Sequence, residues 1–269
     1  MLVCLWGGDR FAWGSPEILV LGAATAVLGG ALVLRERRVA DPIVPLALLR
    51  TRTVRVTSAA LFLATAALFA VTVFVPLFLQ TTTGASPTEA GLLFVPAMLG
   101  ITVSTTLAGR AIERTGRYKR FPVAGLALMS GALAWLAVSS GWTPSRVAAG
   151  AGLLVFGLGF GMVTQVLMTA VQNSVERREL GVATATAGFF RALGGALGAA
   201  VLGAVFAART DGGAVAAGVA HGVQGVFAVG AVMAGLALIA VLALVEVPLR
   251  SGKPKPAAAP SVGRPLAQR

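Results

Sequence analysis

Long apolar runs separated by short basic connections restrict the fold of this chain more than any other feature. A helix needs about 20 apolar residues to cross the hydrocarbon core of a bilayer. Seven runs approach that length, and the only charged residues within the inner five are Glu89, at one end, and Arg191. The sequence therefore predicts an all-α polytopic membrane protein with about seven transmembrane helices, at residues 17–34, 56–80, 89–109, 121–140, 147–173, 183–208 and 222–247.

The charge content supports the same fold class. Charged residues make up 12% of the chain and hydrophobic residues 57%, whereas a soluble domain has about 25% charged residues. A net charge of +12 suggests nucleic acid as a partner. The basic residues, however, form short clusters between apolar runs, as topology signals in membrane proteins do. We therefore expect a lipid bilayer as partner, and no nucleic acid.

Several kinds of chemistry are not expected. Cys4 and His221 are the only cysteine and histidine, so no disulfide, zinc site or cysteine–histidine pair can form within the chain. The glycines at 157, 159 and 161 resemble a nucleotide-binding turn, but they lie inside an apolar run with no strand before them. We interpret them, like Gly194 and Gly198, as sites of close helix packing. We expect no enzyme activity, no metal and no cofactor.

The basic residues also predict an orientation. When successive connections are assigned to alternate sides of a membrane, eighteen Lys and Arg residues fall on one side and three on the other. Cytoplasmic connections carry the excess of positive charge. We therefore expect a multi-pass protein of the cell membrane with its N-terminus outside and its C-terminus in the cytoplasm. The basic side receives Arg35, Arg37, Arg38, Arg50, Arg52, Arg55, Arg110, Arg114, Arg117, Lys119, Arg120, Arg177, Arg178, Arg250, Lys253, Lys255, Arg264 and Arg269.

Three of the predicted helices begin at a hydroxyl residue followed by proline, a pair typical of helix N-termini. The pairs are Ser15-Pro16, Ser86-Pro87 and Thr143-Pro144. Ser86 and Glu89 also have the spacing of a capping box, in which the glutamate binds the backbone N–H of the serine. We therefore interpret Glu89 as a capping residue, with a proton-carrying role as the alternative.

The connection between the third and fourth runs is the most informative motif. Gly116 permits a tight turn there, and Glu113 sits among basic groups able to pair with it. Such a charge cluster can lock against a neighbouring helix end in one conformation and release it in another. A plain topology signal explains the arginines equally well. The connection reads Gly109-Arg110-Ala111-Ile112-Glu113-Arg114-Thr115-Gly116-Arg117-Tyr118-Lys119-Arg120.

This connection resembles the loop Gly-x-x-x-(Asp)-Arg-x-Gly-Arg-(Lys/Arg) of the major facilitator superfamily, in its C-terminal-half copy. Glu113 stands where the family usually has Asp, and the residues that match are Gly109, Arg114, Gly116, Arg117, Lys119 and Arg120. An ordered set of other stretches resembles the fourteen-helix drug:proton antiporter branch, the EmrB/QacA type. The set comprises Trp6-Gly7-Gly8, Trp13-Gly14-Ser15-Pro16, residues 76–80, Gly84-Ala85-Ser86-Pro87, Ala90-Gly91-Leu92, Pro96, Gln172-Asn173 and residues 189–198.

The resemblance implies the last six helices of a fourteen-helix transporter, preceded by one linker helix. It divides the chain into an outer loop and linker helix (1–40), a cytoplasmic amphipathic linker (41–55), a six-helix C-terminal domain (56–250) and a disordered basic tail (251–269). It also implies proton-coupled efflux of drug-like or amphipathic small molecules, with the proton gradient as energy source and a missing N-terminal half as partner. A dedicated exporter of one metabolite and a non-transporting membrane fragment are the alternatives.

Polar side chains recur at helical spacing on two of the predicted helices, which the resemblance makes part of the central cavity wall. Hydroxyls and amides also join helices to one another. We favour that packing role for the row on the second run and the cavity for the row on the fifth. The rows are Ser58, Thr65 and Thr72 on the second run, and Gln165, Thr169, Gln172 and Asn173 on the fifth.

Arg191 is the only cation inside a predicted span. Its side chain either extends to the membrane interface or faces the bundle, where it pairs with a substrate or with a carboxylate of the N-terminal half. Proton-coupled transport needs a titratable group near the membrane midplane. None of the ten acidic residues lies in the middle of a predicted span. We therefore expect that this chain does not carry a proton across the membrane alone.

Overall fold

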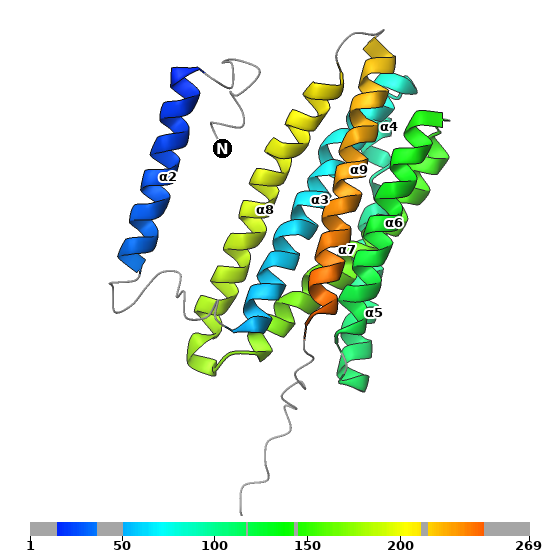
Figure 1. Cartoon of the computed structure of the whole chain (residues 1–269). Coiled ribbons are helices and arrows are strands. Elements are labelled where there is room, and N and C mark those ends of the chain that lie inside the picture. The colour runs from blue at the N-terminus through cyan, green and yellow to red at the C-terminus, as the bar shows by residue number, and fades with distance from the viewer. Residues whose placement is uncertain (1–14, 37–50, 117, 143–144, 211–214, 245–269) are drawn as a thin grey trace, which may run out of the picture.

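The computed structural model describes residues 15–36, 51–116, 118–142, 145–210 and 215–244, and the regular structure in these ranges is entirely helical. Figure 1 shows α3 to α9 side by side as a bundle, with α2 standing apart. The elements are α2 (Pro16–Glu36), α3 (Arg52–Thr82), α4 (Pro87–Leu92), α5 (Val95–Thr115), α6 (Arg120–Trp142), α7 (Arg146–Asn173), the short 3-10 helix η2 (Arg177–Glu179), α8 (Leu180–Arg209) and α9 (Val215–Leu242).

Six helical stretches of the described residues are long and apolar enough to cross a membrane. With α2, which has 21 residues and covers the run predicted at 17–34, they confirm the predicted all-α membrane fold. Several extend beyond the predicted runs, because hydropathy detects only the part of a helix that suits lipid. Helix α3, for example, has 31 residues, or about 46 Å, against a hydrocarbon core of about 30 Å.

Two predicted boundaries change. Helix α3 begins at Arg52, so the last residues of the linker predicted at 41–55 belong to a membrane-length helix. Helix α7 begins at Arg146, and its N-cap is Ser145, whose hydroxyl accepts a hydrogen bond from the Ala148 N–H at 3.5 Å. The prediction that Thr143 caps this helix is therefore wrong, because a serine two residues later takes that position. Residues 1–14, 37–50, 143–144 and 251–269, including the predicted outer loop and tail, lie outside the described residues.

The helix predicted at 89–109 is divided in two. Helix α4 ends at Leu92 and α5 begins three residues later, because Pro96 has no N–H to bond the Leu92 carbonyl and its ring obstructs a continuous helix. The start of α4 is the predicted capping box. Ser86 Oγ accepts a hydrogen bond from the Glu89 N–H at 3.2 Å, and the Glu89 carboxylate accepts one from the Ser86 N–H at 2.8 Å.

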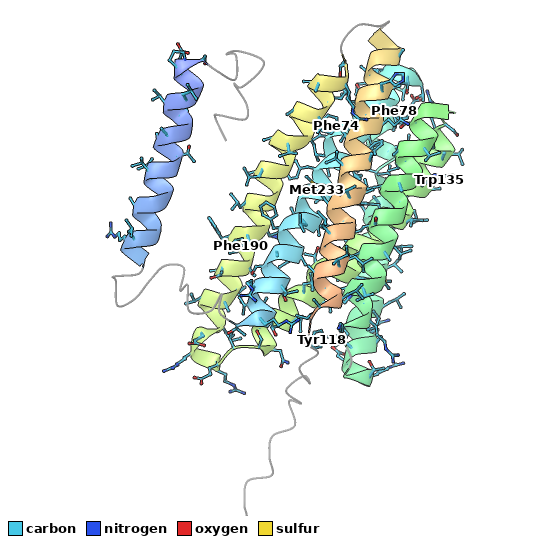
Figure 2. All side chains as sticks on the ribbon, viewed as in Figure 1. Phe74, Phe78, Tyr118, Trp135, Phe190 and Met233 are labelled. Atoms are coloured by element: carbon cyan, nitrogen blue, oxygen red, sulfur yellow. The ribbon has the colours of Figure 1, made fainter. Side chains whose placement is uncertain are left out.

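Helix α3 lies at the centre of the bundle. It packs along α8 and α9 and less extensively on α7, while α6 lies between α7 and α9, and α5 packs on α7. The buried rings of Phe74 and Phe78 fill the upper part of the bundle, whereas Trp135 projects from the outer side of α6 (Figure 2). Helices α6 and α9 therefore cover one side of a group formed by α3, α5, α7 and α8.

Glycines allow several of these helices to approach closely. A Cβ atom at Gly157 would overlap the backbone of Ala97 on α5, and one at Gly194 would overlap the backbone of Phe62 on α3. Small residues at such contacts let helix backbones pack within a bilayer, where lipid is as apolar as the side chains. The predicted packing role of these glycines is confirmed.

Basic residues gather at one end of the bundle. The start of α3, the α5–α6 connection and η2 all lie at the lower end in Figure 1. At the opposite end, the described arginines are Arg146 and Arg209. The predicted charge asymmetry is therefore a property of the folded bundle. The described basic residues at the lower end are Arg52, Arg55, Arg110, Arg114, Lys119, Arg120, Arg177 and Arg178.

Candidate functional site

The predicted loop motif closes the end of α5. Gly116 follows the last residue of that helix with a left-handed backbone (φ 68°), and its N–H donates to the Ile112 carbonyl at 2.8 Å. The predicted turn is thus confirmed. Glu113 and Arg114 are exposed, and Glu113 forms no hydrogen bond or ion pair with another described residue. The predicted pairing of Glu113 is therefore not formed within these ranges, and Arg117 lies outside them.

The two residues after the motif attach this connection to the bundle. Tyr118 is 1% exposed and belongs to a small apolar cluster with Ile112 of α5 and Val166 of α7. Lys119 Nζ donates to the Leu242 carbonyl at 2.9 Å, where the last carbonyls of α9 lack partners within the helix. Figure 2 shows Tyr118 at the lower end of the bundle. The connection therefore joins the ends of α5, α7 and α9.

Alanine at Gly116 is expected to destabilise the protein by about 1 kcal/mol, because a residue with a Cβ atom adopts the left-handed conformation reluctantly. Gly109, which lies inside α5 with open space where a Cβ would stand, provides the control. Gly109→Ala should be neutral or slightly stabilising, because alanine is the better helix former. Thermal unfolding in detergent measures both changes, and equal melting temperatures for the two variants would contradict the expectation.

The polar row predicted on α7 is exposed over the second half of that helix. Gln165 and Gln172 are exposed, and Thr169 is half-buried, as is Asn173. Gln172 Nε2 donates to Thr184 Oγ1 of α8 at 3.3 Å, whereas the Gln165 side chain has no hydrogen-bond partner among the described residues. Exposed amides are costly against lipid, so this face must meet water or protein.

Arg191 lies on the same side of the bundle as this row. It is exposed and forms no hydrogen bond or ion pair with any described residue. Thr184, which bonds Gln172, is seven residues earlier on α8 and therefore on the same helix face. The structure thus brings Arg191 together with the polar row of α7, a relation that sequence spacing could not reveal.

The row on α3 does not join helices by hydrogen bonds. Ser58 is 2% exposed with no partner for its hydroxyl among the described residues, and the exposed Thr72 donates to Leu68 of its own helix at 3.2 Å. Hydroxyls that donate to a neighbouring helix include Thr105, which donates to the Gly161 carbonyl at 3.3 Å, and Ser130. Sequence analysis did not single these out, because serine and threonine are common in every run.

Acidic side chains of the described ranges lie at helix ends. Glu89 caps α4, as predicted, and its carboxylate also pairs with Arg146 at 3.4 Å. Arg146 donates in addition to the Thr83 carbonyl at 3.2 Å, so this pair joins the α3–α4 corner to the start of α7. Both partners are about half exposed, so water screens the pair and it contributes little to stability. Among the described residues, no three His, Cys, Asp or Glu side chains are placed to hold a metal ion.

A protein-family model described as the Major Facilitator Superfamily matches residues 4–199. The chain belongs to the major facilitator superfamily. This major facilitator chain is 40% identical over 203 residues to an uncharacterized MFS-type transporter of Mycobacterium tuberculosis, covering 75% of the chain and 29% of that protein.

Two further relatives of this major facilitator chain have functional names. It is 35% identical over 205 residues to a tetracycline resistance determinant of Streptomyces rimosus, covering 75% of the chain and 58% of that protein. It is 31% identical over 210 residues to the multidrug transporter protein MdtP of Bacillus subtilis, covering 78% of the chain and 38% of that protein. The chain thus spans less than two thirds of the length of each of these relatives. Membership in this family and the apolar helices identify a multi-pass membrane protein.

Proposed function

We propose that this chain is the C-terminal part of a proton-coupled exporter of drug-like or amphipathic small molecules, of the fourteen-helix EmrB/QacA type. In this proposal it lies in the cell membrane with its N-terminus outside and its basic end in the cytoplasm. A second group of helices, the N-terminal half, covers the polar side of α7 and α8. That half also supplies the titratable carboxylate that proton coupling requires.

The exposed polar row of α7 is the observation that carries this proposal. Gln165, Thr169 and Gln172 follow one stripe of the helix, and the preceding residues of that stripe, such as Val147 and Leu154, are exposed and apolar. The first half of the stripe suits an apolar environment, whereas the second half requires a wet or protein-lined one. A water-accessible path beginning partway through the membrane is what alternating access to a midplane site needs.

The names of the relatives support the substrate class. They include a tetracycline resistance determinant, a multidrug transporter and an aspyridones efflux protein of Neocamarosporium betae, which is 31% identical over 216 residues. These names refer to resistance to, transport of or efflux of organic molecules of differing structure. A broad substrate range is therefore the proposal, with a single endogenous metabolite as the narrower alternative.

The test uses inside-out membrane vesicles from cells that produce the complete transporter carrying this chain. An imposed proton gradient should drive several structurally unrelated amphipathic dyes into the vesicles, and a protonophore should stop accumulation, because no other energy source is supplied. Vesicles without the transporter serve as the control. Accumulation that persists with the protonophore would contradict proton coupling. Uptake of one compound alone would favour the dedicated exporter, and no uptake of any compound would contradict the proposed transport.

A further inference from the structure

The hydrogen bond between Gln172 and Thr184 indicates how far along the bundle Arg191 lies. Helices α7 and α8 run in opposite directions, because only a short turn containing η2 joins them. Seven residues away from that bond, about 10 Å along each helix axis, lie Gln165 on α7 and Arg191 on α8. These two residues therefore lie at a similar depth on neighbouring helices.

Helix α3 contributes a hydroxyl at a similar depth. Gly194 packs on Phe62 and Gly198 packs on Ala66. The second contact lies four residues after the first on both helices, so α3 and α8 run parallel. One turn before these contacts, Arg191 on α8 corresponds to Ser58 on α3. The Ser58 hydroxyl is buried and has no partner among the described residues. We call Arg191, Gln165, Thr169 and Ser58, with Gln172 and Thr184 at their base, the polar cluster.

The polar cluster contains a cation and no carboxylate. Arg191 is the twelfth of the 30 residues of α8, about 16 Å along a helix of about 45 Å, and it has no partner in the described ranges. The described acids nearest to it in α8 and the preceding turn are Glu179 and Glu176, and Glu176 pairs with Arg178 at 3.2 Å. Arg55 on α3, two turns before Phe62 on the same face, adds a second positive charge on this side.

An unpaired guanidinium at this depth in a membrane protein either reaches the membrane interface or meets an anionic partner, because an uncompensated charge in contact with lipid is costly. We propose that Arg191 binds the acidic group of the exported molecule, and that the transporter therefore selects amphipathic organic acids and zwitterions carrying a carboxylate or a comparable anion. Arg191 provides two parallel donors suited to a carboxylate. The unpartnered amide of Gln165 provides a further donor at the same depth. This inference rests on the proposed function and narrows its substrate class.

A fixed carboxylate of the N-terminal half is the competing partner for Arg191. Such a pair would require only the guanidinium, and would leave the exposed amide of Gln165 without a role. A ligand with several acceptor atoms uses both groups. The two partners also differ in effect, because a fixed ion pair supports transport of every substrate, whereas a substrate contact affects only substrates that carry the acid.

The test compares a rhodamine bearing a free carboxylate with its methyl ester, two probes that differ only in that group. Binding to the complete transporter in lipid nanodiscs is measured by fluorescence polarisation. The unmodified protein should bind the acid about 10-fold to 100-fold more tightly than the ester, as expected for a hydrogen-bonded charge pair. Arg191→Gln should remove this preference while leaving the affinity for the ester unchanged, and Arg191→Lys should restore part of it.

Arg209→Gln is the matched control, because Arg209 lies five turns further along the same face of α8 at the opposite end of the bundle. It should keep the preference for the acid. An Arg191→Gln protein that loses affinity for both probes equally would overturn the proposal in favour of a fixed ion pair. An unmodified protein that binds the acid no better than the ester would also overturn it. If the protein prefers the acid but shows no proton-driven uptake, the proposed transport is refuted and this inference is not. If it shows uptake but no preference for the acid, this inference is refuted and the proposed transport is not.

Discussion

Valine in place of Gly194 should separate α3 from α8 and sharply lower the amount of folded protein. A Cβ atom at this position would overlap the backbone of Phe62, and a backbone cannot move aside as a flexible side chain can. Gly198, one turn later, packs in the same way on Ala66, so a local shift would disturb both contacts. Overpacking of this kind costs about 3 kcal/mol. Thermal unfolding of the detergent-purified protein measures the loss.

Gly203→Val is the control for that experiment. Gly203 lies on the same helix, nine residues after Gly194, and nothing stands within 4 Å of the position a Cβ would take. Valine there should leave the melting temperature nearly unchanged. An equal loss of stability in the two variants would mean that valine disturbs α8 itself, and the contact between the two helices would no longer explain the result.

Alanine in place of Tyr118 should destabilise the basic end of the bundle by about 3 kcal/mol, the loss typical of removing a buried aromatic ring. Tyr118 is 1% exposed and packs with side chains of α5, α7 and the residue Leu244 after α9. Without its ring, the connection between α5 and α6 should detach more readily, and trypsin should cleave after Arg114, Lys119 and Arg120 more rapidly. Melting temperature and cleavage rate are the two measurements.

The Tyr118→Phe variant distinguishes the contribution of the ring to stability from that of the hydroxyl. Phenylalanine keeps the buried ring, so most of the stability and most of the resistance to trypsin should remain. Lys119→Met tests the neighbouring hydrogen bond to the Leu242 carbonyl, a single surface contact that contributes about 1 kcal/mol. If the alanine variant proves as stable as the phenylalanine variant, the buried ring does not hold this connection to the bundle.

Several site predictions followed from local patterns and proved sound for that reason. The capping box at Ser86 and Glu89 depends on residues three positions apart, and the turn at Gly116 depends on one backbone conformation. The predicted cap at Thr143 failed because two hydroxyl residues competed for one helix start, and the nearer one, Ser145, took it. The division between α4 and α5 was missed although Pro96 signalled it, because the apolar composition continues across the break.

The sequence by itself determined that the chain is an all-α membrane protein with one strongly basic end, because hydropathy and charge act residue by residue and require no knowledge of neighbours. Only the tertiary structure decided which residues meet. The burial of Tyr118, the contact of Gly194 with Phe62, and the common depth of Gln165 and Arg191 all depend on how far each helix is rotated and shifted against the next. Those shifts are set by packing at particular small residues, and no pattern within a single helix specifies the partner that it will contact.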